Sequence, residues 1–261
     1  MTRAARCARL IMRNIKLILE YDGSEFSGFQ RQPGRPTVQE VLEKALSSFF
    51  DRKMKISSAS GRTDAGVHAE GQVVNFKVES DKDLNRIQRG LNAHLPKPVV
   101  VRSVKEVPAG FHARYSARSK VYEYQIWNSP FRSPLLARSA YHVIFPLDLS
   151  AMRKAARFFL GRHDFRSFTS ESAVKKGKKT VSFTRTIKKI LLKKQGNLIL
   201  IRVEADGFLY HMVRNMVGTL LEVGRGKRNP ESIKTILKAK NRSAAGEKVP
   251  SNGLTLLKVS Y

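Results

Sequence analysis

Strand-like and helix-like hydrophobic patterns alternate along the first part of the chain, and this alternation restricts its fold to a mixed class. One helix is predicted over residues 37–49, with Thr37 and Glu40 as a capping box. A second helix is predicted from Leu84 to the Leu95–Pro96 step. Between and around these helices, the patterns predict strands at residues 15–21, 73–78 and 99–104. We expect a compact α+β unit with an antiparallel sheet and helices on one face.

A second unit with a similar order of elements follows, although no residue-level repeat links the two. Helices are predicted over residues 148–160, 208–223 and 230–240. Strands are predicted over 121–127, 181–192, 198–205 and 254–259. We therefore expect an α+β fold of two similar halves, residues 14–108 and 109–261.

The first residues differ in composition from the rest. Residues 1–11 are rich in Arg and contain no acid, which fits a short organellar presequence, a disordered tail or a start at Met12. We expect residues 1–13 to form a disordered tail. No apolar run approaches the ~18 residues that span a bilayer, so no membrane association is expected. The single cysteine, Cys7, excludes a disulfide framework and suits the reducing cytoplasm.

The chain is strongly basic. Lys and Arg number 49 and Asp and Glu 21, which gives a net charge of +28. So large an excess repels itself in the folded state and favours a polyanionic partner, nucleic acid before a membrane surface. No acidic residue lies between Ser172 and Val203. We expect this stretch to contact RNA phosphates, chiefly through Lys175, Lys176, Lys178 and Lys179.

The loop from Gly61 to Ala69 carries the most informative residues. Asp64 and Gly66 suit a tight turn, and Arg62 and Asp64 would share one side of an extended stretch. A nearby guanidinium favours the ionised form of a carboxylate, which serves as a nucleophile or a base. The alternative is that Asp64 only hydrogen-bonds within its own turn.

Two further places carry polar groups in apolar surroundings. Tyr122 and Tyr124 alternate on one strand, so both rings face the same side, either as a platform for stacked bases or as core. Arg214 interrupts an apolar helix and needs a carboxylate, for which Asp64 is a candidate. A different acid, or a helix turned so that Arg214 reaches water, would satisfy it equally.

Metal and nucleotide sites lack support in the sequence. None of the six histidines pairs with another histidine or with cysteine at ligand spacing. Gly224-Arg225-Gly226 lacks both the P-loop and the dinucleotide pattern, and no Gly-x-Ser-x-Gly elbow is present. We expect no metal, no nucleotide and no organic cofactor.

Several motifs together resemble a known family. The run Gly61 to Ala69 resembles the active-site loop of TruA-type tRNA pseudouridine synthases, in which the Asp is catalytic. Colinear motifs extend the resemblance over about residues 14–261: Tyr21-Asp22-Gly23 with Phe26, Gly28 and Gln30, Leu91-Asn92-Ala93, Phe111-His112-Ala113-Arg114, Tyr122-Glu123-Tyr124, His163-Asp164-Phe165 and Phe208 to Asn215.

The resemblance implies specific roles. Asp64 would be the nucleophile or base, Tyr122 would stack on the target uracil, and Arg62 and Arg214 would be the basic residues around Asp64. Thr63 and His68, which flank Asp64 in the same loop, would help to bind the substrate. The resemblance also implies two halves whose sheets join around a basic central cleft, in a homodimer without a cofactor.

The implied reaction is isomerisation of uridine to pseudouridine in the anticodon arm of tRNA, at positions 38 to 40. The motif does not specify the RNA, so a synthase for another RNA is one alternative. A non-catalytic RNA-binding module on the same fold is the second, since basic composition fits both equally. A carboxylate grouped with Arg62, Tyr122 and Arg214 favours the enzyme, because a binder has no need to bury one.

Overall fold

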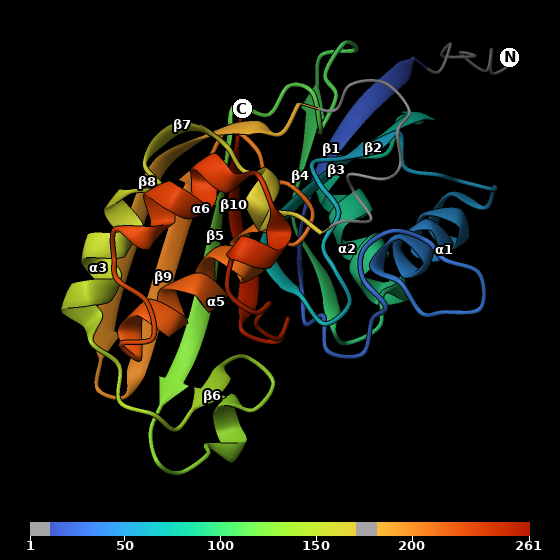
Figure 1. Cartoon of the computed structure of the whole chain (residues 1–261). Coiled ribbons are helices and arrows are strands. Elements are labelled where there is room, and N and C mark those ends of the chain that lie inside the picture. Colours follow the sequence, from blue (N-terminus) through green and yellow to red (C-terminus); the bar gives the residue numbers. More distant parts are fainter. Residues whose placement is uncertain (1–10, 171–181) are drawn as a thin grey trace, which may run out of the picture.

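One continuous sheet runs through the molecule in the computed structural model, which describes residues 11–170 and 182–261 (Figure 1). The strand order within these ranges is β4-β1-β3-β10-β5-β9-β8-β7, with β2 paired to β3 and β6 to β5. The strands are β1 (Met12–Tyr21), β2 (Ser58–Ala59), β3 (His68–Glu79), β4 (Val99–Val107), β5 (Ser119–Asn128), β6 (Tyr141–Val143), β7 (Gly161–Asp164), β8 (Thr184–Gln195), β9 (Leu198–Ala205) and β10 (Leu254–Ser260).

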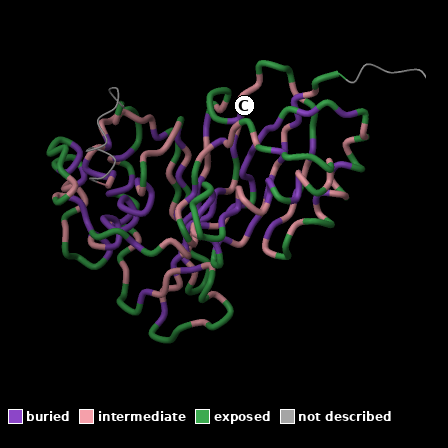
Figure 2. The backbone as a smooth tube through the Cα atoms, turned by 90° about the vertical axis from the view of Figure 1, so that its right-hand side faces the viewer, coloured by how far each residue is buried: buried purple, intermediate pink, exposed green. Residues whose placement is uncertain are grey.

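The α-helices of the described residues divide between the two parts of the sheet (Figure 1). They are α1 (Val38–Phe50), α2 (Leu84–His94), α3 (Leu149–Arg157), α5 (Met212–Gly224) and α6 (Ser232–Ala239). Short 3₁₀ turns lie at Pro134–Leu136, Arg166–Phe168 and Arg242–Ala244. Buried residues, purple in Figure 2, gather in the strands and helices, whereas the connecting loops are mostly exposed. No helix in the described ranges has the length and apolar character to cross a membrane.

The last strand, β10, joins the two parts of the sheet. It pairs parallel with β3 and antiparallel with β5. Tyr21, Ala69, Leu256 and Tyr122 are successive cross-strand neighbours in this region. Neighbours in a row point to the same face, so Tyr21 under the first helices and Tyr122 under α5 lie on one side of the sheet. The predicted α+β class is therefore confirmed, with helices on one face and a sheet that is antiparallel except at β3–β10 and β5–β6.

Most predicted elements are present with shifted ends, and the short strands β2, β6 and β7 were not predicted. The predicted helix over 208–223 begins only at Met212, because His211 has a left-handed backbone with φ of 62°. The predicted boundary between residues 108 and 109 falls between β4 and β5. The division into two domains there, and the basic cleft between them, stay predictions.

The predicted capping box at Thr37 is wrong. The Thr37 hydroxyl is buried and makes no hydrogen bond to any described residue. Carbonyl groups of the preceding loop cap α1 instead, because Gly28 accepts from the backbone N–H of Val38 at 3.3 Å and Phe29 from that of Gln39 at 2.9 Å. Backbone acceptors from the folded loop thus replace the side-chain cap that local sequence predicts.

Gly218 allows a chain crossing that supports the C-terminal half. A Cβ atom at this position of α5 would lie 1.7 Å from the carbonyl oxygen of Glu247. We expect Gly218→Ala to lower the free energy of unfolding by about 2 kcal/mol, because the crossing segment must move. Denaturant unfolding measures this. Gly110→Ala is the control, since nothing lies within 4 Å of its Cβ position. Equal stability of the two variants would contradict the prediction.

Candidate active site

The loop that carries Asp64 lies between β2 and β3 and is held by the N-terminal loop. The backbone N–H of Phe29 donates to the carbonyl of Thr63 at 3.1 Å, and that of Gly66 donates to Phe26 at 3.2 Å. Gly66 has φ of 76°, a conformation that favours glycine. The turn closes with a hydrogen bond from the N–H of Val67 to the carbonyl of Asp64 at 3.2 Å. Asp64 is therefore fixed by backbone contacts on both sides.

The side chain of Asp64 pairs with two residues at the start of α5. Its Oδ2 lies 3.1 Å from Nη1 of Arg214 and 3.3 Å from Nε2 of His211. The side chains of Asp64 and Arg214 are 19% and 10% exposed, so water screens the pair only partly. No hydrogen bond or ion pair within the described ranges involves Oδ1. One carboxylate oxygen is anchored, and the other is left for a ligand.

Arg214 is itself held in place by a second contact. Its Nε donates to the carbonyl of Val249 at 2.9 Å, in the segment that crosses α5. An arginine in an apolar helix needs a carboxylate partner, and for Arg214 this partner is Asp64. This was one of the alternatives that the sequence left open. The pair joins a residue before β3 to one in α5, so it links the two parts of the sheet.

His211 sits between Asp64 and Ser170. The hydroxyl of Ser170 bonds to Nδ1 of the ring, and Tyr210 stacks on the ring with centroids 3.7 Å apart. Burial is the main cause that lowers the pKa of His211 to about 4; the charge of Asp64 opposes the shift, and the cations Lys248, Arg214 and Arg242 add to it. The ring is therefore neutral at pH 7. Its Nε2 lies within 3.3 Å of the Asp64 carboxylate, and Nδ1 bonds to the Ser170 hydroxyl.

Tyr122 lies under the same end of α5. Its ring is buried and meets Phe208 edge to face, with centroids 5.0 Å apart. Burial raises the pKa of Tyr122, and the negative charge of Asp64 adds to the shift, so the hydroxyl keeps its proton. Tyr124, on the same face, is fully buried and donates to the carbonyl of Pro250 at 2.7 Å. Tyr124 is core, and Tyr122 alone of this pair lies by the carboxylate.

Thr63 and His68 fasten the loop to other parts of the protein. The Thr63 hydroxyl bonds to the hydroxyl of Tyr21 at 2.8 Å. His68 Nδ1 lies 3.2 Å from the N–H of Gly23, and Nε2 lies 2.8 Å from the carbonyl of Arg138 and 3.1 Å from that of Asn252. Both side chains thus make protein contacts that set the position of Asp64.

Arg62 was expected to lie beside Asp64, and its role there stays a prediction. Its side chain is exposed, and no ion pair joins it to Asp64 in the part of the chain that the structure describes. The partners of Asp64 come from α5 instead. The four lysines Lys175, Lys176, Lys178 and Lys179 lie outside the described residues.

Sequence reasoning did not single out His211, Ser170 or Lys248. His211 lies within the run Phe208 to Asn215. A neutral histidine does not need a charged partner, so the sequence pattern gives no sign of its contacts. Lys248 is brought near by the crossing over Gly218, which depends on the fold. The left-handed backbone at His211 is a structural signal of a functional position, because residues other than glycine seldom adopt it.

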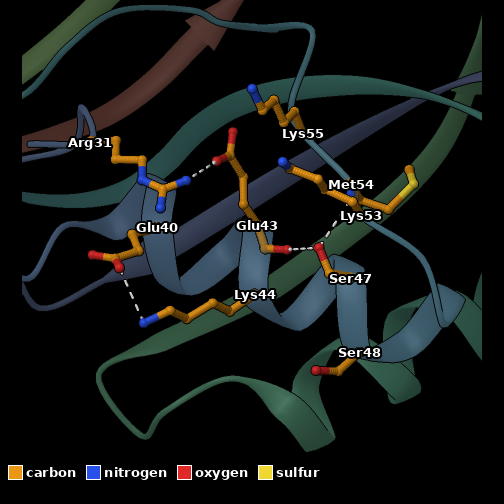
Figure 3. Close-up of a pocket in the computed structure, with 9 residues that line it drawn as sticks. All are labelled: Arg31, Glu40, Glu43, Lys44, Ser47, Ser48, Lys53, Met54 and Lys55. Atoms are coloured by element: carbon orange, nitrogen blue, oxygen red, sulfur yellow. Dashed lines mark hydrogen bonds and ion pairs between the residues drawn. The ribbon is translucent and has the colours of Figure 1, made fainter.

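A surface hollow of about 250 Å³ lies elsewhere, along α1. Figure 3 shows two ion pairs among the side chains that line it. Arg31 lies 3.7 Å from Glu43, and Lys44 lies 3.1 Å from Glu40. Among the described residues no group of three or more His, Cys, Asp or Glu side chains is placed to hold a metal ion. The cluster around Asp64 is therefore the candidate site.

Known proteins resemble this chain over nearly its full length. A family model described as tRNA pseudouridine synthase matches residues 17–116 and 155–261. A protein named tRNA pseudouridine synthase A from Acetivibrio thermocellus is 43% identical over 250 residues, which cover 96% of this chain and 100% of that protein. A protein of the same name from Brevibacillus brevis gives the same identity and coverage. Another from Colwellia psychrerythraea is 42% identical over 243 residues, 93% of this chain and 92% of that protein.

Proposed function

The chain belongs to the tRNA pseudouridine synthase family, and from this premise we propose that it converts uridine to pseudouridine in the anticodon arm of tRNA, at positions 38 to 40. The enzyme is an isomerase, since pseudouridine has the same atoms as uridine. The observation that carries the proposal is the grouping of Asp64 with Arg214, His211 and Tyr122, with one carboxylate oxygen left without a protein partner.

The reaction requires three events in one enclosed place. The bond between N1 of uracil and C1′ of ribose breaks, the uracil turns, and C5 bonds to C1′ while the C5 proton moves to N1. Oδ1 of Asp64 is available to attack the ribose, to add to the uracil ring or to take a proton, and these routes remain alternatives. The target uridine must first leave its stack, which costs a few kcal/mol.

Tyr122 and the arginines support these events in different ways. The ring of Tyr122 offers a flat surface for the uracil, and its protonated hydroxyl is available for the transfer of the C5 proton. Arg214 and His211 hold Asp64 through Oδ2. The exposed Arg62 is free to enter the space that the flipped uridine leaves. The four lysines from Lys175 to Lys179 supply further contacts to the RNA backbone.

The proposal includes the partners of the enzyme. Its substrate is tRNA, and two copies of the chain form a homodimer in which one tRNA contacts both. The proposed location is the cytoplasm, where tRNA is present. Sedimentation of the protein alone and with tRNA tests the dimer, because a monomer in both samples contradicts it.

The decisive assay is pseudouridine formation on unmodified tRNA transcripts. One transcript carries uridines at positions 38 to 40 and a control transcript carries cytidines there, both with EDTA present. We expect product only from the first. Product at other positions would point to a different substrate specificity. Tight binding without product on any tRNA would favour the RNA-binding module.

His211 gives the site a pH dependence of stability. A histidine in the unfolded chain binds a proton near pH 6.5, whereas burial lowers the folded pKa to about 4. Between these values the unfolded state holds the extra proton, so the free energy of unfolding falls as pH drops from 6.5 towards 4. We expect this fall to be shallower in His211→Asn, since asparagine tolerates the left-handed backbone without titrating.

Denaturant unfolding at several pH values in this window measures the effect. The control is His94→Asn, because His94 is exposed at the end of α2. A profile for His211→Asn that matches the wild type would contradict the prediction.

A further inference from the structure

Three basic side chains interact electrostatically with one another near the start of the Asp64 loop, which Lys120 contacts, and they have no part in the chemistry described above. Lys120 stands on β5 two residues before Tyr122, on the same face of the sheet, and so about 7 Å along the strand. Arg185 stands on β8, and Arg114 lies in the segment before β5. The charges of Arg114 and Arg185 both act on Lys120 and on each other. We call these three residues the basic triplet.

Lys120 contacts the backbone that leads into the Asp64 loop. Its Nζ donates to the carbonyl of Ser60 at 2.5 Å. It also lies 3.2 Å from the position that a Cβ of Gly61 would occupy. An ammonium group has three N–H donors, and among the described residues Ser60 is the only hydrogen-bond acceptor for them. Lys120 therefore has donors to spare immediately before Arg62 and Asp64.

Arg185 reaches the same face of the sheet from the other side. Lys120 pairs with Ala205, and Ala205 pairs with Ile187, two residues beyond Arg185. Alternation along β8 then directs Arg185 to the face that carries Lys120. Its Nη1 donates to the carbonyls of Ser182 at 2.8 Å and Thr184 at 2.6 Å, and Nε lies 3.4 Å from the Cβ position of Gly207. The guanidinium is thus held in one orientation.

The positive charge of the triplet is poorly balanced. Within residues 11–170 and 182–261 no carboxylate forms an ion pair with any of the three, and Asp206 alone acts favourably on Arg185. Burial, followed by the charges of Arg114 and Arg185, lowers the pKa of Lys120 to about 8. Like charges held together in a partly buried place destabilise the protein until an anion joins them.

We propose that Lys120, Arg114 and Arg185 bind one phosphodiester of the substrate RNA, next to the uridine that enters the site. This inference rests on the proposed function, which makes RNA the ligand. A phosphodiester suits the triplet because it is anionic and has oxygens that accept from both ammonium and guanidinium groups. Lys120 stands on β5 two residues from Tyr122, so the strand sets the distance between the bound phosphate and the stacked base. It fixes where the RNA backbone runs past Asp64.

The first test measures tRNA affinity at several salt concentrations. Lys120→Gln keeps a donor for Ser60 and removes the charge, whereas Lys120→Arg keeps the charge. We expect Lys120→Gln to weaken tRNA binding about fivefold near 0.1 M salt. The slope of log affinity against log salt concentration should fall by about the amount that one lost phosphate contact accounts for. Lys120→Arg should match the wild type. Lys105→Gln, exposed on β4 at the far edge of the sheet, is the control for net charge.

The second test locates the phosphate with an anticodon-arm hairpin that carries one neutral methylphosphonate linkage. We expect one linkage adjacent to the target uridine to weaken binding by the wild type and to have no further effect on Lys120→Gln. The assignment would be overturned if, at each of the two flanking linkages, the methylphosphonate weakened binding by Lys120→Gln as much as binding by the wild type. An unchanged salt slope in Lys120→Gln would also overturn it.

The third test uses pH. Burial lowers the pKa of Lys120 to about 8, so its ammonium loses its proton as the pH rises from 7 to 9, whereas an arginine at this position keeps its charge. Wild-type affinity for tRNA should therefore fall from pH 7 to 9 more than that of Lys120→Arg, and equal falls would contradict the role of Lys120. Binding is measured whether or not pseudouridine forms, so a failure of the proposed reaction stays distinguishable from a failure of the phosphate site.

Discussion

Asp64→Asn is expected to lower kcat for pseudouridine formation by at least about a thousandfold, while the affinity for tRNA stays within about threefold. Asparagine has nearly the shape of aspartate, and its carbonyl oxygen still accepts from Arg214. It neither attacks carbon as an anion nor takes up a proton, however, so every proposed route through Oδ1 is lost. The backbone contacts that hold the loop are unaffected, because they involve Phe26, Phe29 and Val67.

Single-turnover rates with saturating enzyme separate this chemical defect from a binding defect. Asp22→Asn is the matched control, since Asp22 also lies near the loop, 3.1 Å from His68, but makes no contact with Arg214. We expect the control to keep at least about half of the wild-type rate. An Asp64→Asn variant that retains a tenth of the activity would remove Asp64 from the chemistry.

Arg214→Met is expected to lower both activity and stability. Methionine fills much of the apolar space but leaves Oδ2 of Asp64 without its cation and the carbonyl of Val249 without its donor. Breaking such a largely buried pair costs about 3 kcal/mol of unfolding free energy. Loss of the anchor also lets Asp64 rotate, so we expect kcat to fall by at least about a hundredfold.

Arg102→Met provides the comparison, because Arg102 pairs with Glu20 at 2.6 Å with side chains 58% and 37% exposed. An exposed pair of this kind contributes little to stability, because water screens it. Urea unfolding of the two variants therefore compares a buried with an exposed ion pair in one protein. Equal losses of stability would show that the pair between Asp64 and Arg214 has no special structural role.

Local patterns predicted the parts of the fold that depend on periodicity. The helix α1 and the strand β1 occur where apolar spacing placed them, with ends shifted by a few residues. The cap of α1 was mispredicted because it comes from carbonyls of a folded loop, not from the side chain of Thr37. Short strands such as β7 follow from pairing with β8 and leave little signal of their own.

The candidate site shows the same division. The pair between Asp64 and Arg214 was foreseeable, because an arginine in an apolar helix needs an anion. The side chain of Arg62 is exposed and makes no ion pair with Asp64 among the described residues, so its role stays a prediction. His211 was missed, because a neutral ring in the sequence does not require a charged partner. A sequence shows where a charged side chain in apolar surroundings needs a partner of opposite charge. It does not show contacts of neutral side chains that only the fold brings together.

The position of β10 has a consequence for synthesis on the ribosome. Of the strands in the continuous sheet, β10 emerges last, yet it lies between β3 and β5. Until it emerges, Ala69 and Tyr122 lack Leu256, the residue that joins them across the sheet. Val249, which holds Arg214 against Asp64, emerges just before it. A nascent chain can therefore build each part of the sheet in turn, but it completes the site only when β10 leaves the exit tunnel. Chains that lack β10 would meet tRNA without an assembled carboxylate, so activity is reserved for chains in which β10 has been translated.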